Sequence, residues 1–353
     1  MGKKKTKVII ELLSSLTSIS SITAGTAVIA YESIFTRFDR PDYAITPGEY
    51  CYERVSNELQ RMELSYPSSE GNLKGYYYHV DNAKGIVIVS HGLKSGGDDY
   101  IPIIKYFVKA GFAVFSYNNT GTYESDGDDT VGMCQAIIDL ESTIKFIKNQ
   151  MILSRLPIFL VGHSWGGYAA GSVLCVTKEI SGCAIIASMN NGCNMMYDKA
   201  EQYVGKLANV PKPVFMTYQK LLFGDYVNYT CVQGINSTDI PVVIAHGVDD
   251  KTILFKDQSV ISHKNEITNP NVRYYVGKGV HGDHVNIWHS KESACYQLEV
   301  ASELKYLEFS KGRELSYDEK VEFYKTVNHK LYSAVNEELM ALIAETFESA
   351  LNK

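Results

Sequence analysis

The stretch Pro157–Gly167, with the sequence PIFLVGHSWGG, decides the fold. Its first half, Ile158–Val161, is short, continuous and apolar, as expected of a buried strand. It runs directly into Gly162–Gly166, which matches the motif G-x-S-x-G. In that motif a sharp strand-to-helix turn strains the serine backbone, so the flanking glycines are needed for steric reasons. The turn exposes the hydroxyl of Ser164 at the N-terminus of a following helix, where backbone N–H groups favour negative charge.

Two later apolar runs end in residues that can activate a serine. Ile240–Ala245 reads as a second buried strand and is followed by Asp249 and Asp250. A carboxylate just beyond the carboxyl end of a strand lies where α/β sheets place their catalytic groups. There it can orient a histidine and stabilise the imidazolium that forms when a serine loses its proton. Either aspartate fits this role, and both could instead cap the next helix.

The histidine is expected in the glycine-rich segment after a third strand-like run, Asn271–Val276. Glycines allow a loop to bring a histidine toward a serine from another part of the fold. His281 lies between Gly279 and Gly282, and we choose it as the general base, with His284 as the alternative. The spacing of the two histidines fits neither a helical metal pair nor a zinc finger, so we expect no metal. The chain has no GxGxxG and no P-loop lysine motif, so we expect no nucleotide cofactor.

These motifs resemble the α/β-hydrolase superfamily, and within it the serine aminopeptidase S33 and monoacylglycerol-lipase-like branch. The matching segments are SHG at Ser90–Gly92, GHSWGG at Gly162–Gly167, HGVDD at His246–Asp250 and GKGVHG at Gly277–Gly282. The resemblance implies that Asp250, rather than Asp249, orients the histidine. It also implies that the backbone N–H groups of Leu93 and Trp165 form an oxyanion hole. One departure is Asn119–Thr122, where the family usually carries Arg-Gly-x-Gly.

Composition and strand pattern agree with a single α/β domain. The chain has 353 residues, 45% of them hydrophobic and 21% charged, which suits a globular protein with a large core. Continuous apolar runs indicate strands covered on both faces, hence a mostly parallel central sheet flanked by helices. The earlier segments 54–66 and 73–80 would add an antiparallel start. The predicted strands are Gly85–Ser90, Phe112–Tyr117, Ile158–Gly162, Cys183–Ala187, Pro241–Ala245 and Val272–Val276.

Two segments do not fit this pattern of buried strands connected by helices. Residues 188–238 are too long for an ordinary connection and contain helix-like pieces, and the resemblance implies a helical lid over the active site. Methionine and aromatic side chains give this segment an adaptable apolar surface, which could line an acyl pocket or pack the lid onto the core. The last part, residues 315–353, is helical in pattern and is expected to pack over one end of the sheet.

The N-terminal part, residues 1–35, carries a different signal from the hydrolase domain expected over residues 45–353. Four lysines precede a run without formal charge, residues 12–31, which is long enough to cross a bilayer. The sequence therefore predicts a membrane anchor, and by the positive-inside rule the catalytic domain would lie outside the cytoplasm. A cleaved signal peptide and an amphipathic surface helix are the alternatives, so the protein is anchored, secreted or cytoplasmic. Membrane association through residues 8–31 is therefore expected.

The sequence predicts a serine hydrolase of carboxylic esters that works through Ser164, His281 and Asp250. Its substrate would be a small ester or a short acyl or peptide compound. An aminopeptidase is the first alternative and would need acidic lid residues, for which Asp198, Glu201 and Asp225 are available. A non-catalytic binding relative is the second alternative, although no member of the triad is missing. A formal net charge of −6 provides no basic footprint, so we expect no nucleic-acid partner.

Overall fold

A computed structural model describes residues 5, 7, 8, 25, 28–151, 153–204 and 212–351. Its centre is an eight-stranded sheet with the order β1-β2-β4-β3-β5-β6-β7-β8. Strands β1 and β2 pair antiparallel, β2 pairs antiparallel with β4, and all other neighbours pair parallel. The strands are β1 Arg61–Ser68, β2 Gly71–Tyr78, β3 Ile86–Ser90, β4 Ala113–Tyr117, β5 Ile158–His163, β6 Ile180–Ile186, β7 Val242–Gly247 and β8 Val272–Gly277.

The predicted α/β fold and its mostly parallel sheet are confirmed. Every residue of β3, β4, β5 and β7 is buried, which is the pattern expected of strands covered on both faces. The antiparallel start is also present, although β1 begins seven residues later than the predicted segment at Arg54. Helices fill both faces because successive parallel strands need crossover connections.

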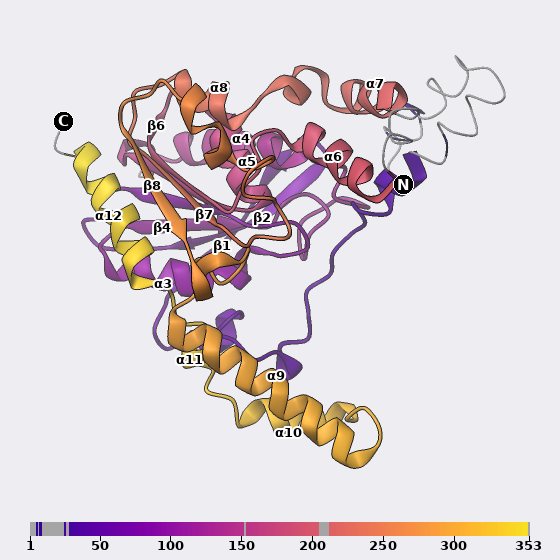
Figure 1. Ribbon diagram of the computed structural model, residues 1–353. Helices are drawn as coiled ribbons and strands as arrows, with labels where there is room; N and C mark the ends of the chain where they lie inside the picture. Colours follow the sequence, from indigo (N-terminus) through magenta and orange to yellow (C-terminus); the bar gives the residue numbers. More distant parts are fainter. Residues whose placement is uncertain are drawn as a thin grey trace.

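The sheet divides the hydrophobic core into two layers, and helices cover each layer (Figure 1). The buried side chains of α4 and α5 belong to one cluster, and those of α3 and α12 belong to the other. Helices α9 and α10 extend away from the sheet on the side opposite to α7 and bury a small cluster of their own. The bounds are α3 Ile101–Lys109, α4 Gln135–Lys148, α5 Trp165–Val173, α9 Lys291–Lys311, α10 Tyr317–Lys325, α11 His329–Tyr332 and α12 Glu337–Leu351.

The C-terminal part is broken into three helices rather than one. Leu339, Ile343 and Phe347 share one face of α12 and are fully buried. The ring of Phe347 stacks on Phe159 of β5 with centroids 4.7 Å apart. This contact fixes α12 against the face of the sheet opposite to α4 and α5.

The predicted lid segment contains α6 Gly192–Val204, α7 Lys212–Phe223 and α8 Cys231–Asn236. Several of its apolar side chains pack inward: Met189, Tyr218, Leu222 and Phe223 are at least 96% buried. Leu221, by contrast, is 44% exposed. Much of the apolar character of this segment therefore serves its attachment to the core.

Most of the uncharged run predicted as an anchor or signal peptide lies outside the described residues. Within the described part of the chain, no helix is long and apolar enough to cross a membrane. Residues 28–32 are helical, and Val28, Tyr31 and Phe35 are buried in the same cluster as α4 and α5. This end of the run is therefore in contact with protein. Residues 28–32 lie beside α7 (Figure 1), where the ring of Tyr31 contacts Tyr218.

Candidate active site

Ser164 occupies the sharp turn between β5 and α5. Its backbone has φ 57° and ψ −117°, a conformation that residues other than glycine rarely adopt. A Cβ atom on Gly162 would lie 2.2 Å from the carbonyl oxygen of Gly166, and one on Gly166 would lie 2.0 Å from that of Ser90. Both glycines are therefore required for the close approach of backbone segments that holds the serine in this turn.

Ser164, His284 and Asp250 form a hydrogen-bonded chain at the carboxyl ends of β5, β8 and β7. The Nε2 atom of His284 lies 2.9 Å from Ser164 Oγ. Its Nδ1 atom lies 2.7 Å from Asp250 Oδ2. These distances suit transfer of the serine proton to Nε2, with the carboxylate fixing the tautomer of the ring.

The choice of His281 as the base is wrong, and the alternative, His284, occupies that position. His281 lies in a 3-10 turn, Gly279–Gly282, and its Nδ1 is 3.1 Å from the carbonyl oxygen of Asn286. The chain becomes extended at Asp283, with φ −92° and ψ 175°. Asp283 then accepts hydrogen bonds from the backbone N–H groups of Val285 and Asn286. This local turn, which lies beyond the glycines, fixes the position of His284.

The carboxylate of Asp250 is buried and fully paired. Its Oδ1 accepts hydrogen bonds from the N–H groups of Thr252 and Ile253 at 2.8 and 2.9 Å. Its Oδ2 contacts His284 and also lies 3.2 Å from His246 Nε2. Burial opposes the charge, but hydrogen bonds from His246 and His284 outweigh it and lower the pKa of Asp250 well below its usual value.

Asp249 does not join this arrangement. Its side chain is exposed, and its backbone N–H donates to the carbonyl oxygen of Gly282 at 2.8 Å. It helps to connect the loops that follow β7 and β8. Of the two adjacent aspartates, the structure therefore brings Asp250 to the histidine.

The two amides predicted to bind an oxyanion flank Ser164. The N–H of Trp165 is the first of α5, where helix geometry leaves such groups without a partner inside the helix. A Cβ atom on Gly92 would lie 3.5 Å from Ser164 Cβ, so the loop that leads to Leu93 runs alongside the serine. Within the described part of the chain, neither amide donates a hydrogen bond to another group. Both are therefore available to an oxygen that becomes negative in the reaction.

A buried network that the sequence did not reveal joins the base to the loop before Leu93. His163 donates from Nε2 to the carbonyl oxygen of His284 at 2.9 Å. Its Nδ1 accepts from the hydroxyl of Tyr100 at 2.7 Å, and this hydroxyl accepts from the N–H of Gly92 at 3.0 Å. Burial lowers the pKa of His163 to about 3, so its ring is neutral near pH 7. The motif contained His163, but no sequence signal pointed to Tyr100.

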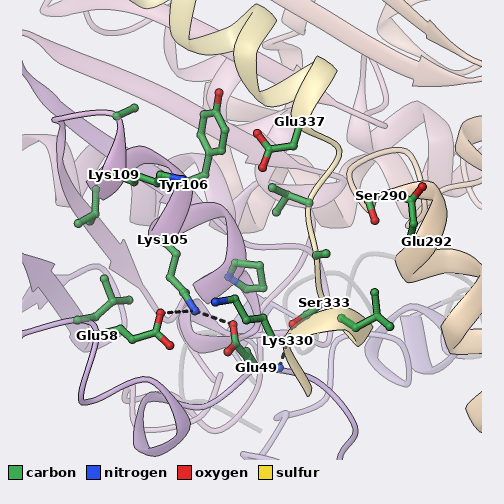
Figure 2. A pocket seen from close by; sticks show the side chains of 17 residues that line it. Glu49, Glu58, Lys105, Tyr106, Lys109, Ser290, Glu292, Lys330, Ser333 and Glu337 are labelled. Atoms are coloured by element: carbon green, nitrogen blue, oxygen red, sulfur yellow. Dashed lines mark hydrogen bonds and ion pairs between the residues drawn. The ribbon is translucent and has the colours of Figure 1, made fainter. Parts of the chain in front are cut away.

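The described residues include no group of three or more His, Cys, Asp or Glu side chains placed to hold a metal ion. A groove of about 950 Å³ lies elsewhere, between α3 and the segment that joins α11 to α12 (Figure 2). The Nζ of Lys105 reaches Glu49 Oε2 at 2.8 Å and Glu58 Oε2 at 2.9 Å there, so its charge is already balanced. None of the three residues of the hydrogen-bonded chain lines this groove.

Comparisons with known proteins agree with this fold. Residues 81–222 match the family model described as serine aminopeptidase, S33. The chain has the α/β-hydrolase fold. The matched region contains the serine turn and the loop with Leu93 but ends before Asp250 and His284. A search of curated protein sequences finds no match.

Two solved structures share this fold. An esterase from Pyrococcus furiosus is 19% identical, with a TM-score of 0.53, and the alignment covers 71% of this chain and 91% of that one. Est1E from Butyrivibrio proteoclasticus is 11% identical, with a TM-score of 0.52, over 82% of this chain and 99% of that one. At these identities the likeness shows a common fold alone.

Proposed function

We propose that this α/β hydrolase cleaves carboxylic esters through a covalent acyl-enzyme. The observation that carries the proposal is the chain from Ser164 Oγ through His284 to the buried Asp250, with links of 2.9 and 2.7 Å. A serine hydroxyl is a weak nucleophile at neutral pH, and a neighbouring base of this kind activates it. The strained turn at Ser164 adds support, because strain of this kind persists where the surrounding structure imposes it for a function.

In the proposed mechanism His284 Nε2 takes the proton as Ser164 Oγ attacks the ester carbonyl. The carbonyl oxygen becomes negative and accepts hydrogen bonds from the N–H groups of Leu93 and Trp165. Asp250 stabilises the imidazolium and keeps the Nδ1 proton on the ring. The imidazolium then gives its proton to the leaving alkoxide, and the acyl group stays on Ser164. Water, deprotonated by His284, attacks the acyl-enzyme. The imidazolium gives this proton to Ser164 Oγ as the acyl bond breaks, which releases the carboxylic acid and restores the serine.

Ester hydrolysis is the preferred activity because an alkoxide leaves more easily than an amine. The family match to serine aminopeptidases supports a peptidase as the second candidate. A peptidase of that kind needs a carboxylate to hold the substrate ammonium. Of the lid residues considered for this, Asp225 is exposed and paired with Lys220 at 2.6 Å, which leaves it poorly suited. Glu201 is exposed on α6.

The proposed substrate is a small ester or a short acyl compound, and no nucleic-acid partner is proposed. Membrane association through residues 8–31 remains a proposal that rests on the sequence, since most of that segment lies outside the described residues. Of the described residues in that segment, Val8, Val28 and Tyr31 are buried against the core, whereas Ile29 is 71% exposed. The proposed contact with lipid therefore leaves out these three buried side chains.

The test is labelling of the full-length protein with a fluorophosphonate, followed by mapping of the modified peptide. Labelling at Ser164 that is lost in Ser164→Ala and His284→Ala is the expected result. Hydrolysis of 4-nitrophenyl esters of increasing chain length is then compared with that of aminoacyl 4-nitroanilides. A folded protein that neither labels nor turns over any of these compounds would contradict the proposal. Faster turnover of the anilides would favour the peptidase.

A further inference from the structure

The segment before α4 has an unfavourable backbone conformation close to the site. Val131 has φ 58°, a left-handed conformation that is especially costly for a β-branched residue. Its side chain is 96% buried. The next residue, Gly132, has φ 157°, and a Cβ atom there would lie 2.0 Å from the hydroxyl oxygen of Tyr31. Strain of this kind persists only where neighbouring structure holds it in place.

The N-terminal residues supply the contacts that hold this segment. The hydroxyl of Tyr31 accepts a hydrogen bond from the N–H of Met133 at 3.0 Å. The N–H of Thr130 donates to the carbonyl oxygen of Phe35 at 2.9 Å. An isolated β-bridge joins Asp129 to Thr36, one residue after Phe35. The strained segment is thus held along its length by residues that come about a hundred positions earlier.

The same segment contacts the expected oxyanion hole. The carbonyl oxygen of Met133 accepts a hydrogen bond from the indole Nε1 of Trp165 at 2.7 Å. Trp165 is 99% buried and is the first residue of α5, so its indole and its backbone N–H belong to one fixed unit. Met133 therefore lies between Tyr31, bound through its N–H, and Trp165, bound through its carbonyl.

Tyr31 also contacts the lid. Its hydroxyl donates to Gln219 Oε1 of α7 at 3.4 Å. Its ring lies edge-on to Phe215 and Tyr218, with centroids 5.2 and 6.0 Å away. The hydroxyl of Tyr218 donates to Glu32 Oε1 at 2.8 Å, so α7 is attached to the N-terminal helix by two adjacent residues.

We propose that residues 28–36 are a positioning element of the active site. In this role Tyr31 holds Met133 and through it Trp165, and it links the lid helix α7 to the oxyanion side of the site. The inference rests on the proposed function, because the value of holding Trp165 lies in the oxyanion that its N–H binds. Tyr31 acts through other residues and does not touch the substrate.

The test is Tyr31→Phe in the full chain, with Tyr66→Phe as the matched control. Tyr66 is equally buried, and its hydroxyl lies 2.7 Å from Thr143 Oγ1, among the side chains between α4 and β1. Removing an oxyanion donor outright costs about 10²–10³-fold in kcat, so displacing one should cost about 10-fold. We expect that loss in kcat for Tyr31→Phe, with KM changed less than about 3-fold. Tyr66→Phe should keep kcat within about 2-fold of the parent value.

Two further measurements distinguish a specific effect on the position of Trp165 from a general loss of stability. The midpoint of the pH–rate profile should not move in Tyr31→Phe, because Ser164, His284 and Asp250 keep their contacts. In a Trp288→Phe background Trp165 is the only tryptophan left, since the chain has 2. Its fluorescence should shift to longer wavelength on Tyr31→Phe and not on Tyr66→Phe. Each variant is measured well below its own Tm.

Equal kcat for the two variants together with unchanged Trp165 emission would overturn the inference. A change in kcat that comes with a shifted pH midpoint would also overturn it, because the effect would then reach the base. Failure of the proposed function is a separate outcome, since the parent protein would then not label at Ser164. The Trp165 emission tests the contact even in that case.

Discussion

His284 Nε2 lies 2.9 Å from Ser164 Oγ, whereas the ring of His281, three residues earlier, contacts the carbonyl oxygen of Asn286. The two histidines therefore provide a matched pair of variants. His284→Ala should lower kcat/KM by at least ~10³-fold because the serine loses its proton acceptor. His281→Ala should stay within about 10-fold of the parent. Ester hydrolysis and circular dichroism on both proteins check this, and a dead His281→Ala beside an active His284→Ala would refute the assignment.

The adjacent residues Asp249 and Asp250 provide a second matched pair of variants, which tests the carboxylate that orients His284. Asp250→Asn removes the negative charge that faces His284 Nδ1 and allows the ring to adopt the wrong tautomer. We expect a loss of about 10³–10⁴-fold in kcat. Asp249→Asn, at an exposed side chain, should change kcat less than about 3-fold. The measurement is turnover at saturating ester, and equal losses in the two variants would argue against a special role for Asp250.

Tyr100→Phe tests the network between the base and the oxyanion loop. The substitution removes the hydroxyl that joins His163 Nδ1 to the N–H of Gly92. Two buried groups lose a partner, so the free energy of unfolding should fall by about 1–3 kcal/mol. We expect kcat to fall about 10-fold, because both His284 and Leu93 lose a support. Tyr106→Phe, on the helix α3 that follows Tyr100, is the control and should leave kcat unchanged. Equal kinetics for the two variants would limit Tyr100 to a structural role.

The sequence predicted the sheet and the serine turn because their causes are local. Continuous apolar runs gave six strands within a few residues, and glycines at positions 162 and 166 are needed wherever a strand turns this sharply into a helix. For the same reason the sequence left only two candidates, Asp249 and Asp250, for the carboxylate that orients the histidine. A carboxylate after β7 must lie at the carboxyl edge of the sheet, whichever aspartate carries it.

The position of the histidine, the network around it and the burial of the N-terminal run depend on contacts between residues, which no local sequence pattern shows. Glycines on both sides of His281 suggested mobility, but the residues from Asp283 to Asn286 form the turn that directs His284 to the serine. The contact between Tyr100 and His163 joins residues 63 positions apart. The apolar end of the N-terminal run, with Tyr31, was interpreted as part of a membrane or export signal. In the described structure Val28 and Tyr31 are buried in the core, whereas Ile29 is 71% exposed. Composition alone cannot separate a membrane environment from a protein core.

Acid should destabilise the protein through its buried histidines. Burial is the main cause that lowers the pKa of His163 to about 3 and the pKa values of His91 and His289 to about 4, from an ordinary 6.5. Below pH 6.5 these histidines bind protons in the unfolded chain but stay neutral in the folded chain. Stability is therefore complete above pH 6.5 and is lost as the pH falls toward 4. Asp250 adds to this loss only below about pH 3.8, its ordinary value.

His289→Asn isolates one of these contributions away from Ser164. The variant removes a group that must charge on unfolding in acid, worth on the order of 2 kcal/mol at pH 4.5. The fall in Tm between pH 7 and pH 4.5 should be several degrees smaller than in the parent. His79→Asn, at a side chain that is 61% exposed, is the control and should keep the parental fall. Thermal unfolding followed by circular dichroism at both pH values measures the effect. If His289→Asn lost as many degrees as His79→Asn, burial of His289 would not be what makes the fold acid-sensitive.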